Sequence, residues 1–382
     1  MGDPLLKLDS LAKETRKIFK ERNAVIDSYF LSLLTGNHMF LLGEPGTAKT
    51  AIVNFVSNSI DGAEYFYWLM TKYTIPEEVF GGPDVGEFMQ GRYKRVTDHK
   101  LPVAHFAFID EIFKSSSSIL NCLLSIMNEK FFFDATSVIS VPLISLVGAS
   151  NEIPSDTELN ALYDRFLIRH YVERVKDRRS RKAVVMNDLP DRASTCINLN
   201  DVMEARGLFE AAIPKMTFDI DFYLDLHKLL IDKHGIIISD RRLKKCAKLV
   251  LANAFLDGRD ATTSEDFGVL KNCFWTEPSQ IPIVSKAVNE IVNPLGQRAV
   301  ELLDEATEIF QNCMKLAGES DKKGAIQYGV EANAKLKDIL ETIEKEINGS
   351  NGASTLELGI AKDKIRGEMV TKIVTEVLGA SL

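Results

Sequence analysis

The stretch Met39-Phe-Leu-Leu-Gly-Glu-Pro-Gly-Thr-Ala-Lys-Thr50 decides the fold. Its first four residues form an apolar run of strand length, and a segment with helical spacing, Ala51–Ile60, follows the glycine-rich loop. A phosphate-binding P-loop requires this order, because inward-facing backbone N–H groups and a helix N-terminus attract phosphate. The alternative is a Gly/Pro turn that merely precedes a helix. That alternative does not account for Lys49 and Thr50 in register with the strand and the helix.

The residues of this loop have separate expected roles in binding a nucleotide. Lys49 is expected to reach the β- and γ-phosphate oxygens, and the Thr50 hydroxyl to bind Mg²⁺. The common P-loop pattern has glycine immediately before the lysine, where this chain has Ala48. We expect its methyl group to be tolerated because the position can still be helical. The expected nucleotide-binding residues are Gly43, Glu44, Pro45, Gly46, Thr47, Ala48, Lys49, Thr50 and, from another strand, Asp110.

A second apolar strand pattern, His105-Phe-Ala-Phe-Ile109, ends in the carboxylates Asp110 and Glu111. A buried parallel strand delivers its C-terminal residues to the ligand-binding edge of the sheet, where the P-loop also lies. Asp110 is expected to help hold Mg²⁺, and Glu111 to polarise the water that attacks the γ-phosphate. Alone, the two acids fit a helix cap equally well, but beside a P-loop they indicate a nucleoside triphosphatase. Asn151 ends a further strand pattern and is expected to hydrogen-bond the γ-phosphate or this water.

Apolar runs of strand length alternate with helical patterns over the first half of the chain, which predicts an α/β fold whose parallel sheet is covered by helices on both faces. The predicted strands are Met39–Leu42, Tyr65–Leu69, Phe106–Ile109 and Leu143–Val147. Beyond about residue 185 helical spacing takes over, and no run of strands is apparent. The predicted domains are a nucleotide-binding core at 1–190, an all-α lid at 191–295 and a C-terminal bundle of three amphipathic helices at 296–382.

Composition narrows the function classes. The 382 residues suffice for two or three domains, and the formal net charge of -8 argues against a general nucleic-acid coat protein. No apolar run approaches the roughly 18 residues that cross a membrane, and no secretory signal is apparent, so we expect a cytoplasmic protein without membrane insertion. The five cysteines and six histidines show no metal-ligand spacing.

The order of the motifs along the chain resembles that of the AAA+ ATPases: a P-loop, a strand ending in Asp-Glu, a strand ending in Asn, the segment Ala161-Leu-Tyr-Asp-Arg-Phe166 and a helical lid. The P-loop, with alanine before the lysine, is similar to that of the MoxR family. Six segments resemble the RavA branch of that family. They are Ile75-Pro-Glu-Glu-Val-Phe-Gly81, Gly91-Arg-Tyr93, Asp110-Glu-Ile-Phe-Lys114, Ile119-Leu-Asn-Cys-Leu-Leu124, Ala149-Ser-Asn-Glu152 and Ser239-Asp-Arg-Arg242.

The resemblance implies roles for two arginines. Arg165 corresponds to the arginine finger that reaches the ATP of a neighbouring subunit, where a guanidinium can donate to the charge that builds on the γ-phosphoryl oxygens. An exposed Arg165 paired with Asp164 is the alternative. Arg241 matches the lid arginine, sensor 2, which contacts the γ-phosphate of the same chain. Arg242 takes that role if the register shifts by one residue.

The resemblance also implies two insertions that face the central pore in related rings. Pro83–Thr97, with a turn and then a strand at Arg92–Val96, matches an insertion in helix 2. Phe131–Ser140 matches a hairpin before the Asn-tipped strand, and Phe131–Phe133 fit a pore loop and an ordinary core strand equally well. The basic stretch Arg174–Lys182 could contact a partner or nucleic acid, but we favour a solvated linker between core and lid.

The chain departs from the bacterial RavA pattern at Asn348–Ser354, a short loop where that pattern has a β-rich partner-binding domain. We expect a Mg²⁺-dependent ATP hydrolase that forms a homo-hexameric ring and remodels a protein client, for which a von Willebrand A domain protein is one candidate. A nucleic-acid-stimulated motor is the alternative, with Arg92, Lys94 and Arg95 lining a basic pore. The acidic balance makes nucleic acid the less favoured partner. A scaffold that binds ATP without turnover would not need the full catalytic set.

Overall fold

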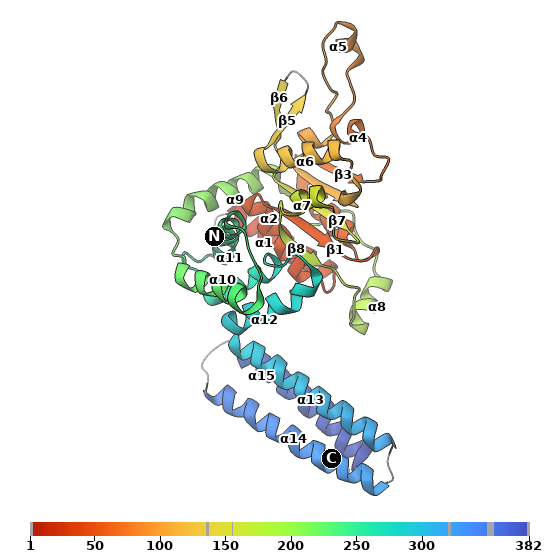
Figure 1. Cartoon of the computed structure of the whole chain (residues 1–382), viewed down its shortest axis with the longest axis vertical. Coiled ribbons are helices and arrows are strands. Elements are labelled where there is room, and N and C mark those ends of the chain that lie inside the picture. The colour runs from red at the N-terminus through yellow and green to blue at the C-terminus, as the bar shows by residue number, and fades with distance from the viewer. Residues whose placement is uncertain (1–2, 135–136, 155, 320–321, 350–354, 380–382) are drawn as a thin grey trace. The chain divides into compact units, whose positions relative to one another are not determined.

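The structure is a computed structural model that describes residues 3–134, 137–154, 156–319, 322–349 and 355–379. The chain divides into two compact units, residues 1–281 and 282–382. The first unit contains the sheet and the helices that follow it, and the second contains a helical bundle (Figure 1). This division falls in helix α12 (Ile281–Val292), and the domain boundaries near residues 190 and 295 stay predictions.

A five-stranded parallel sheet forms the centre of the first unit, with the strand order β3-β4-β7-β1-β8. Its strands are β1 (His38–Leu42), β3 (Tyr65–Leu69), β4 (Phe106–Asp110), β7 (Ser145–Ser150) and β8 (Phe166–Tyr171). The α/β fold and the four predicted strands are confirmed, although the last of them begins only at Ser145. Every residue of β1 and β7 is buried, which explains their continuous runs of apolar and small residues.

Three strands, β8, β2 (Ile60–Asp61) and β9 (Ile197–Asn198), lie where the sequence pattern does not predict them, and β2 takes up the end of the predicted helix Ala51–Ile60. The pattern misses β8 because the strand contains Arg169 and His170, yet both side chains are buried, with 1% and 6% exposed. The short β9 (Ile197–Asn198) pairs in parallel with β2 (Ile60–Asp61), so the expectation of no strand beyond residue 185 is wrong at this point. A two-residue strand is too short to show periodicity.

Helices pack against this sheet on both sides (Figure 1). They are α1 (Asp3–Ile18), α2 (Asn23–Thr35), α3 (Lys49–Asn58), α4 (Pro76–Phe80), α6 (Ser117–Glu129) and α7 (Thr157–Tyr163). Helix α8 (Arg178–Met186) follows the last strand and has no buried residue. The apolar stripe of α6, Ile119, Leu123 and Ile126, belongs to one buried cluster with strand residues such as Phe40 and Phe166. The spacing of these residues at intervals of three and four puts them on one helix face.

The two predicted insertions have different outcomes. The predicted hairpin is confirmed as β5 (Phe131–Asp134) and β6 (Ser137–Ser140), which pair antiparallel; residues 135 and 136 between them lie outside the described residues. Phe132 is buried and stacks on Phe80, with ring centroids 5.2 Å apart, whereas Phe131 and Phe133 are exposed. Successive side chains of a strand point to opposite faces, so this strand is a core strand on one face and exposed on the other.

The strand predicted at Arg92–Val96 is wrong. The insertion instead contains the short helix α5 (Val85–Met89), and a single bridge joins Pro83 to Arg95. Arg92 folds back on this helix: its N–H donates to the Glu87 carbonyl (3.0 Å), and its side chain pairs with the Glu87 carboxylate (2.5 Å).

After β9, the first unit is mainly helical, as predicted. They are α9 (Leu199–Ala212), α10 (Ile220–His234), α11 (Asp240–Leu256) and the 3-10 helix Ser264–Asn272. Leu226, Leu230, Val250 and Ala254 from the predicted apolar stripes are buried.

The second unit is a helical bundle formed by α13 (Pro294–Glu319), α14 (Lys322–Gly349) and α15 (Leu356–Lys364), which continues into the π-helical segments Ile365–Val370 and Ile373–Val377. The predicted stripes meet in its core, where Leu302, Leu336, Ile343, Ile365 and Ile373 are buried. The predicted loop Asn348–Ser354 lies mostly outside the described residues. None of the helices in the described part of the chain has the length and apolar character needed to span a membrane.

Candidate active site

The P-loop leaves β1 under a tight steric constraint. The Gly43 N–H donates to the Ser150 carbonyl on β7 (3.1 Å), and the Val172 N–H after β8 donates to the Leu42 carbonyl (2.7 Å). A Cβ atom on Gly43 would lie 2.4 Å from the Val172 carbonyl oxygen, and its φ is 153°. Only glycine fits between these two backbones.

Ala48 precedes α3 in the left-handed region, with φ 67° and ψ 19°. The expectation that this position can be helical is therefore wrong. The left-handed conformation costs a residue with a Cβ atom about 1–2 kcal/mol, which explains why the common pattern has glycine here. The loop holds this strain directly before Lys49.

Lys49 turns its side chain back over the loop. Its Nζ donates to the carbonyl oxygens of Gly43 (2.5 Å) and Glu44 (2.9 Å), and only 7% of the side chain is exposed. Burial lowers the pKa of Lys49, and the nearby charges of Asp110 and Glu111 oppose this shift. A partly desolvated ammonium group held in this way is suited to an anionic phosphate.

β4 and β7 bring the predicted carboxylates and amide together. The N–H of Glu111, which has a left-handed φ of 51°, donates to Oδ1 of Asp110 (3.0 Å). Asn151, just after β7, donates from Nδ2 to Oε1 of Glu111 (2.8 Å), and Lys114 Nζ lies 3.3 Å from Oε2 of the same carboxylate. Glu111 is thus held by two side chains from different segments.

A cavity of about 280 Å³ lies between the P-loop and these residues. Its lining consists of Pro45, Gly46, Thr47, Ala48, Lys49, Thr50, Ala51, Asp110, Glu111 and Asn151. Two predicted residues, Gly43 and Glu44, do not line the cavity; their carbonyl groups hold Lys49 instead. Backbone N–H groups, a cation and two carboxylates around one cavity fit a phosphate chain with its cation.

A second cavity, of about 540 Å³, shares Gly46, Thr47 and Ala48 with the first. Residues 17–20 at and after the end of α1, residues 183–184 of α8 and residues 187–190 after it also line the cavity. Arg22 ties this region to the P-loop, because its Nε donates to the Thr47 carbonyl (3.2 Å) and its Nη2 to the Glu173 carbonyl (2.6 Å). This apolar cavity beside the phosphate site has room for a nucleoside.

No sequence pattern indicates this second cavity, because its lining comes from segments without a recognisable motif. Much of the basic stretch expected to be a solvated linker forms the start of α8, while Arg174 lines the cavity and pairs with Glu44 (2.7 Å). The signal that could have found it is the apolar run Ala183–Met186 directly after the charges.

The donor atoms near the P-loop fit Mg²⁺. The Thr50 hydroxyl and the Asp110 carboxylate both line the phosphate cavity and supply the hard oxygen ligands that this ion prefers. In the described part of the chain, no group of three or more His, Cys, Asp or Glu side chains could hold a metal by itself. In Mg²⁺ sites, phosphate oxygens and water usually complete the coordination.

The two predicted arginines line neither of these two cavities. Arg165 Nη1 is 3.5 Å from Asp164, and its buried Nε has no hydrogen-bond partner among the described residues. Arg241, at the start of α11, donates to Oδ1 of Asn128 (2.5 Å). Burial, with a contribution from the charge of Arg241, lowers the pKa of Arg165.

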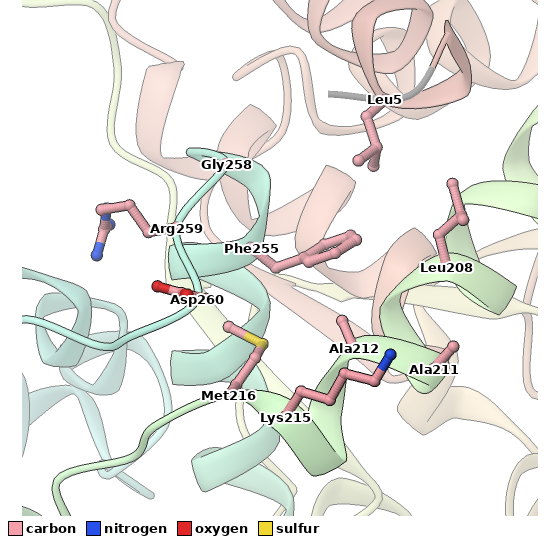
Figure 2. Close-up of a pocket in the computed structure, with 10 residues that line it drawn as sticks. All are labelled: Leu5, Leu208, Ala211, Ala212, Lys215, Met216, Phe255, Gly258, Arg259 and Asp260. Atoms are coloured by element: carbon pink, nitrogen blue, oxygen red, sulfur yellow. The ribbon is translucent and has the colours of Figure 1, made fainter.

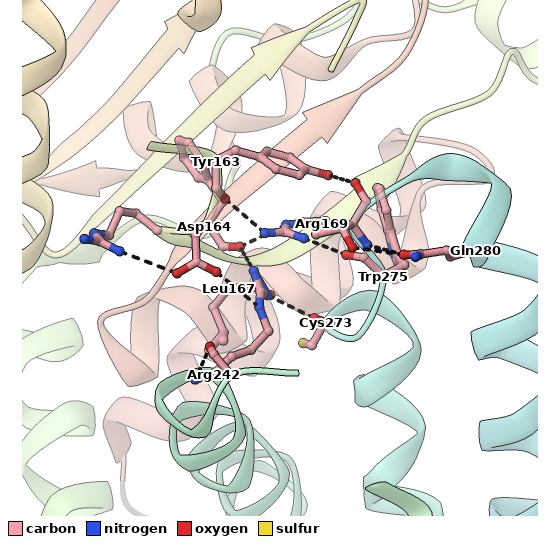
Figure 3. Close-up of polar contacts among 12 residues, drawn as sticks. Tyr163, Asp164, Leu167, Arg169, Arg242, Cys273, Trp275 and Gln280 are labelled. Atoms are coloured by element: carbon pink, nitrogen blue, oxygen red, sulfur yellow. Dashed lines mark hydrogen bonds and ion pairs between the residues drawn. The ribbon is translucent and has the colours of Figure 1, made fainter. Parts of the chain in front are cut away.

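Arg242 has a different environment from Arg241. Its side chain is 7% exposed and donates to the carbonyl oxygens of Phe166, Leu167 and Cys273 (Figure 3). A guanidinium group whose donors are used in this way is not available to a nucleotide. The alternative in which Arg242 is the lid arginine therefore receives no support.

Figure 2 shows a further cavity, of about 770 Å³, lined by residues of α1, α9 and the end of α11. Leu5, Leu208 and Phe255 give it a largely apolar lining. The cation Arg259 at this cavity already pairs with Asp266 (2.6 Å). None of the predicted site residues lines it.

The fold and the site define the class: a P-loop nucleoside triphosphatase with a helical lid, of the AAA+ type. A family model described as the MoxR domain in MoxR-vWA-beta-propeller ternary systems matches residues 6–195, and one for the AAA lid domain matches residues 216–288.

Individual proteins show the same likeness. An uncharacterized protein of Methanocaldococcus jannaschii is 38% identical over 314 residues, covering 82% of this chain and 80% of that protein. The chaperone MoxR1 of Mycobacterium tuberculosis is 24% identical over 201 residues, covering 51% and 52%. The crystal structure of a candidate ATPase from Cytophaga hutchinsonii has a TM-score of 0.59 at 18% identity, covering 75% and 95%. The chain belongs to the MoxR family of AAA+ ATPases, a membership that implies ATP hydrolysis.

The left-handed Ala48 leads to a prediction about stability. We expect Ala48→Gly to raise the free energy of unfolding by about 0.5–1 kcal/mol, because relief of strain exceeds the extra entropy of glycine in the unfolded chain. Urea unfolding monitored by circular dichroism measures the change. Ala51→Gly, three residues later inside α3, is the matched control and should lower stability by about 0.5–1 kcal/mol. A loss of stability in Ala48→Gly would contradict the strain.

Proposed function

We propose that this chain is a Mg²⁺-dependent ATPase in which Glu111 activates the attacking water. The observation that carries the proposal is the meeting of Lys49, Thr50, Asp110, Glu111 and Asn151 around one cavity. The adjoining apolar cavity between α1 and α8 gives the nucleoside a place beside the phosphate chain.

Each residue has one task in this scheme. The P-loop N–H groups and Lys49 hold the β- and γ-phosphates, and Thr50 and Asp110 hold Mg²⁺, which neutralises the developing charge. Glu111 orients a water molecule and accepts its proton as the water oxygen bonds to the γ-phosphorus and the bond to the ADP oxygen breaks. Asn151 fixes the carboxylate of Glu111 at 2.8 Å, which sets the direction of the water.

The position of Arg165 and Arg241 supports an action in trans. Neither arginine lines a cavity at the P-loop of its own chain, and the charge of Arg241 contributes to the lowered pKa of Arg165. Adjacent cations repel, and an anion placed between them relieves that repulsion. We therefore place both arginines against the γ-phosphate bound to a neighbouring subunit. Arg241 then acts on the neighbouring site and not on the site of its own chain. The subunits form a homo-oligomeric ring, which we take to be a hexamer.

The client of such a ring is proposed to be a protein. The matching family model is described for systems that include a vWA component, and one relative is named a chaperone, so a von Willebrand A domain protein is the first candidate. We place the chain near the RavA branch on its motifs. The alternative, a nucleic-acid motor, needs free cations in the insertion that contains α5. Arg92 pairs with Glu87 there, and Arg95 pairs with Asp134. Few cations of the insertion are therefore free to bind nucleic acid.

Removal of the Glu111 carboxylate tests the chemistry. Glu111→Gln should lower kcat for ATP by about 10²–10⁴-fold with the nucleotide dissociation constant unchanged, because only proton transfer is lost. Phosphate release and binding of a fluorescent ATP analogue measure the two quantities. Glu152→Gln changes an exposed neighbour of Asn151 and should leave both unchanged. Normal turnover in Glu111→Gln would remove the proposed role.

Subunit mixing tests the action in trans. Arg165→Ala and Arg241→Ala should each bind ATP normally but hydrolyse it more slowly, by about 10³-fold for Arg165 as an arginine finger. Mixing either variant with Lys49→Ala subunits, which keep both arginines, should restore turnover at sites that face them. Lys233→Ala, at an exposed position in α10, is the control. If only Arg165→Ala is rescued, Arg241 acts within its own chain.

The hydrolysis-deficient ring also tests the class of client. Glu111→Gln rings loaded with ATP should retain a protein containing a vWA domain, whereas rings without nucleotide should release it. Binding is measured by co-sedimentation with a purified candidate from the same genome. Retention of single-stranded DNA or RNA with a steep salt dependence, and no retention of protein, would favour the motor.

A further inference from the structure

The turn that carries Arg165 lies between α7 and β8 and is held by two buried guanidinium groups. Arg169, on β8, has 1% of its surface exposed, and Arg242, on α11, has 7%. They approach the turn from the core and from the lid helix, respectively (Figure 3).

Arg169 binds both sides of the turn. Its Nη2 donates to the carbonyl of Tyr163 (3.1 Å) and its Nε to that of Phe166 (3.2 Å), the residues that flank Asp164 and Arg165. Its Nη1 donates to the carbonyl of Trp275 (2.6 Å), in the segment after the 3-10 helix. The guanidinium also lies 3.9 Å from the centre of the Tyr163 ring.

Arg242 repeats this bridge from the lid. Its Nη2 donates to the Phe166 carbonyl (2.8 Å), and its Nη1 to the carbonyls of Leu167 (2.8 Å) and Cys273 (2.9 Å). Its Nε lies 3.8 Å from Oδ1 of Asp164, the carboxylate whose other oxygen is 3.5 Å from Arg165 Nη1. Asp164 therefore stands between the two arginines.

The lid segment 273–276 is thus joined to the turn at three points. Carbonyl groups of Cys273 and Trp275 accept from the two guanidinium groups, and that of Thr276 accepts from the Tyr163 hydroxyl (2.8 Å). We use the name carbonyl seam for these bonds between residues 163–169, Arg242 and segment 273–276.

The seam brings two cations together in the interior, although burial of charge is costly. Burial and the neighbouring charge of Arg242 lower the pKa of Arg169 to about 9. Apolar side chains of similar size often replace buried charges without loss of stability. A planar guanidinium, however, offers several donors in a fixed fork, so one side chain can hold carbonyl groups of two segments at set angles.

We propose that Arg169 and Arg242 are positioning residues for Arg165, which tie its turn to lid segment 273–276 so that the placement of the lid directs the arginine toward the neighbouring nucleotide. This inference rests on the proposed action of Arg165 in trans. Neither arginine touches a nucleotide; both act through the carbonyl groups that flank Arg165.

The experiment uses Arg242→Lys, which keeps the charge but loses the fork, in full-length mixed rings. Its subunits have an intact P-loop, so mixing with Lys49→Ala subunits, which keep a working Arg165, should restore turnover. Mixing with Arg165→Ala subunits should not restore it, because neither partner then supplies a positioned arginine. Nucleotide binding and ring formation of Arg242→Lys subunits are measured with fluorescent ATP and by light scattering. Loss of both properties would show that the seam has a merely structural role and would overturn the inference.

Two further mixtures complete the design. Restored turnover with Arg242→Lys and Arg165→Ala together would show that Arg165 still works without the seam, and would overturn this inference alone. Absence of turnover with Lys49→Ala and Arg165→Ala together would instead overturn the action of Arg165 in trans and the inference with it.

Matched variants guard against an unstable protein. Arg206→Lys changes a half-buried arginine whose Nη1 donates to the Leu33 carbonyl (2.9 Å), away from the turn. Its subunits should still rescue Arg165→Ala subunits. Tyr163→Phe removes a single bond of the seam and should lower rescue of Arg165→Ala by a few-fold with the melting temperature little changed. Full rescue of Arg165→Ala subunits by both Tyr163→Phe and Arg169→Lys subunits would contradict the positioning role of the seam.

Discussion

The close approach of Gly43 to its neighbouring backbones is the constraint on which the site depends. β1 lies between β7 and β8, and the first residue of the P-loop bonds to Ser150 on one side and meets Val172 on the other. This contact fixes where the loop begins relative to Asn151. Because β4 pairs with β7, it also fixes the distance to the Asp110 and Glu111 carboxylates.

Two residues of the P-loop site that are not glycine have left-handed backbone conformations. Ala48 immediately precedes Lys49, and Glu111 is itself left-handed, although neither is glycine. Strained residues persist only where the surrounding structure holds them, and they concentrate at functional sites. The sheet edge provides this support here, through the bonds of Glu111 with Asn151 and of Gly43 with Ser150.

The phosphate half of the site can be predicted from sequence because its residues form short local patterns. The strand and loop around Lys49 and the strand before Glu111 each contain their own signal, and parallel pairing brings them to one edge. The cavity beside α8 cannot be found this way, because it forms between segments distant in sequence. The left-handed state of Ala48 is equally hidden, since alanine itself favours a helix.

The arginines show the same limit in the lid. Arg241 and Arg242 are neighbours in sequence but point about 100° apart around α11, so packing alone decides which is buried. β8 escapes prediction because Arg169 looks like a surface residue, while its partners are carbonyl groups that no sequence pattern reveals.

The chemistry of the carbonyl seam has a consequence for the conditions under which the molecule can work. Its acceptors are backbone carbonyl groups, which do not titrate, so acidification removes none of the carbonyl bonds of Arg169 and Arg242. Short buried bonds are also little screened by dissolved ions, unlike the exposed pair of Arg92 and Glu87 at the tip of the insertion. The link between lid and Arg165 should therefore hold across changes in acidity and salinity that weaken the surface ion pairs.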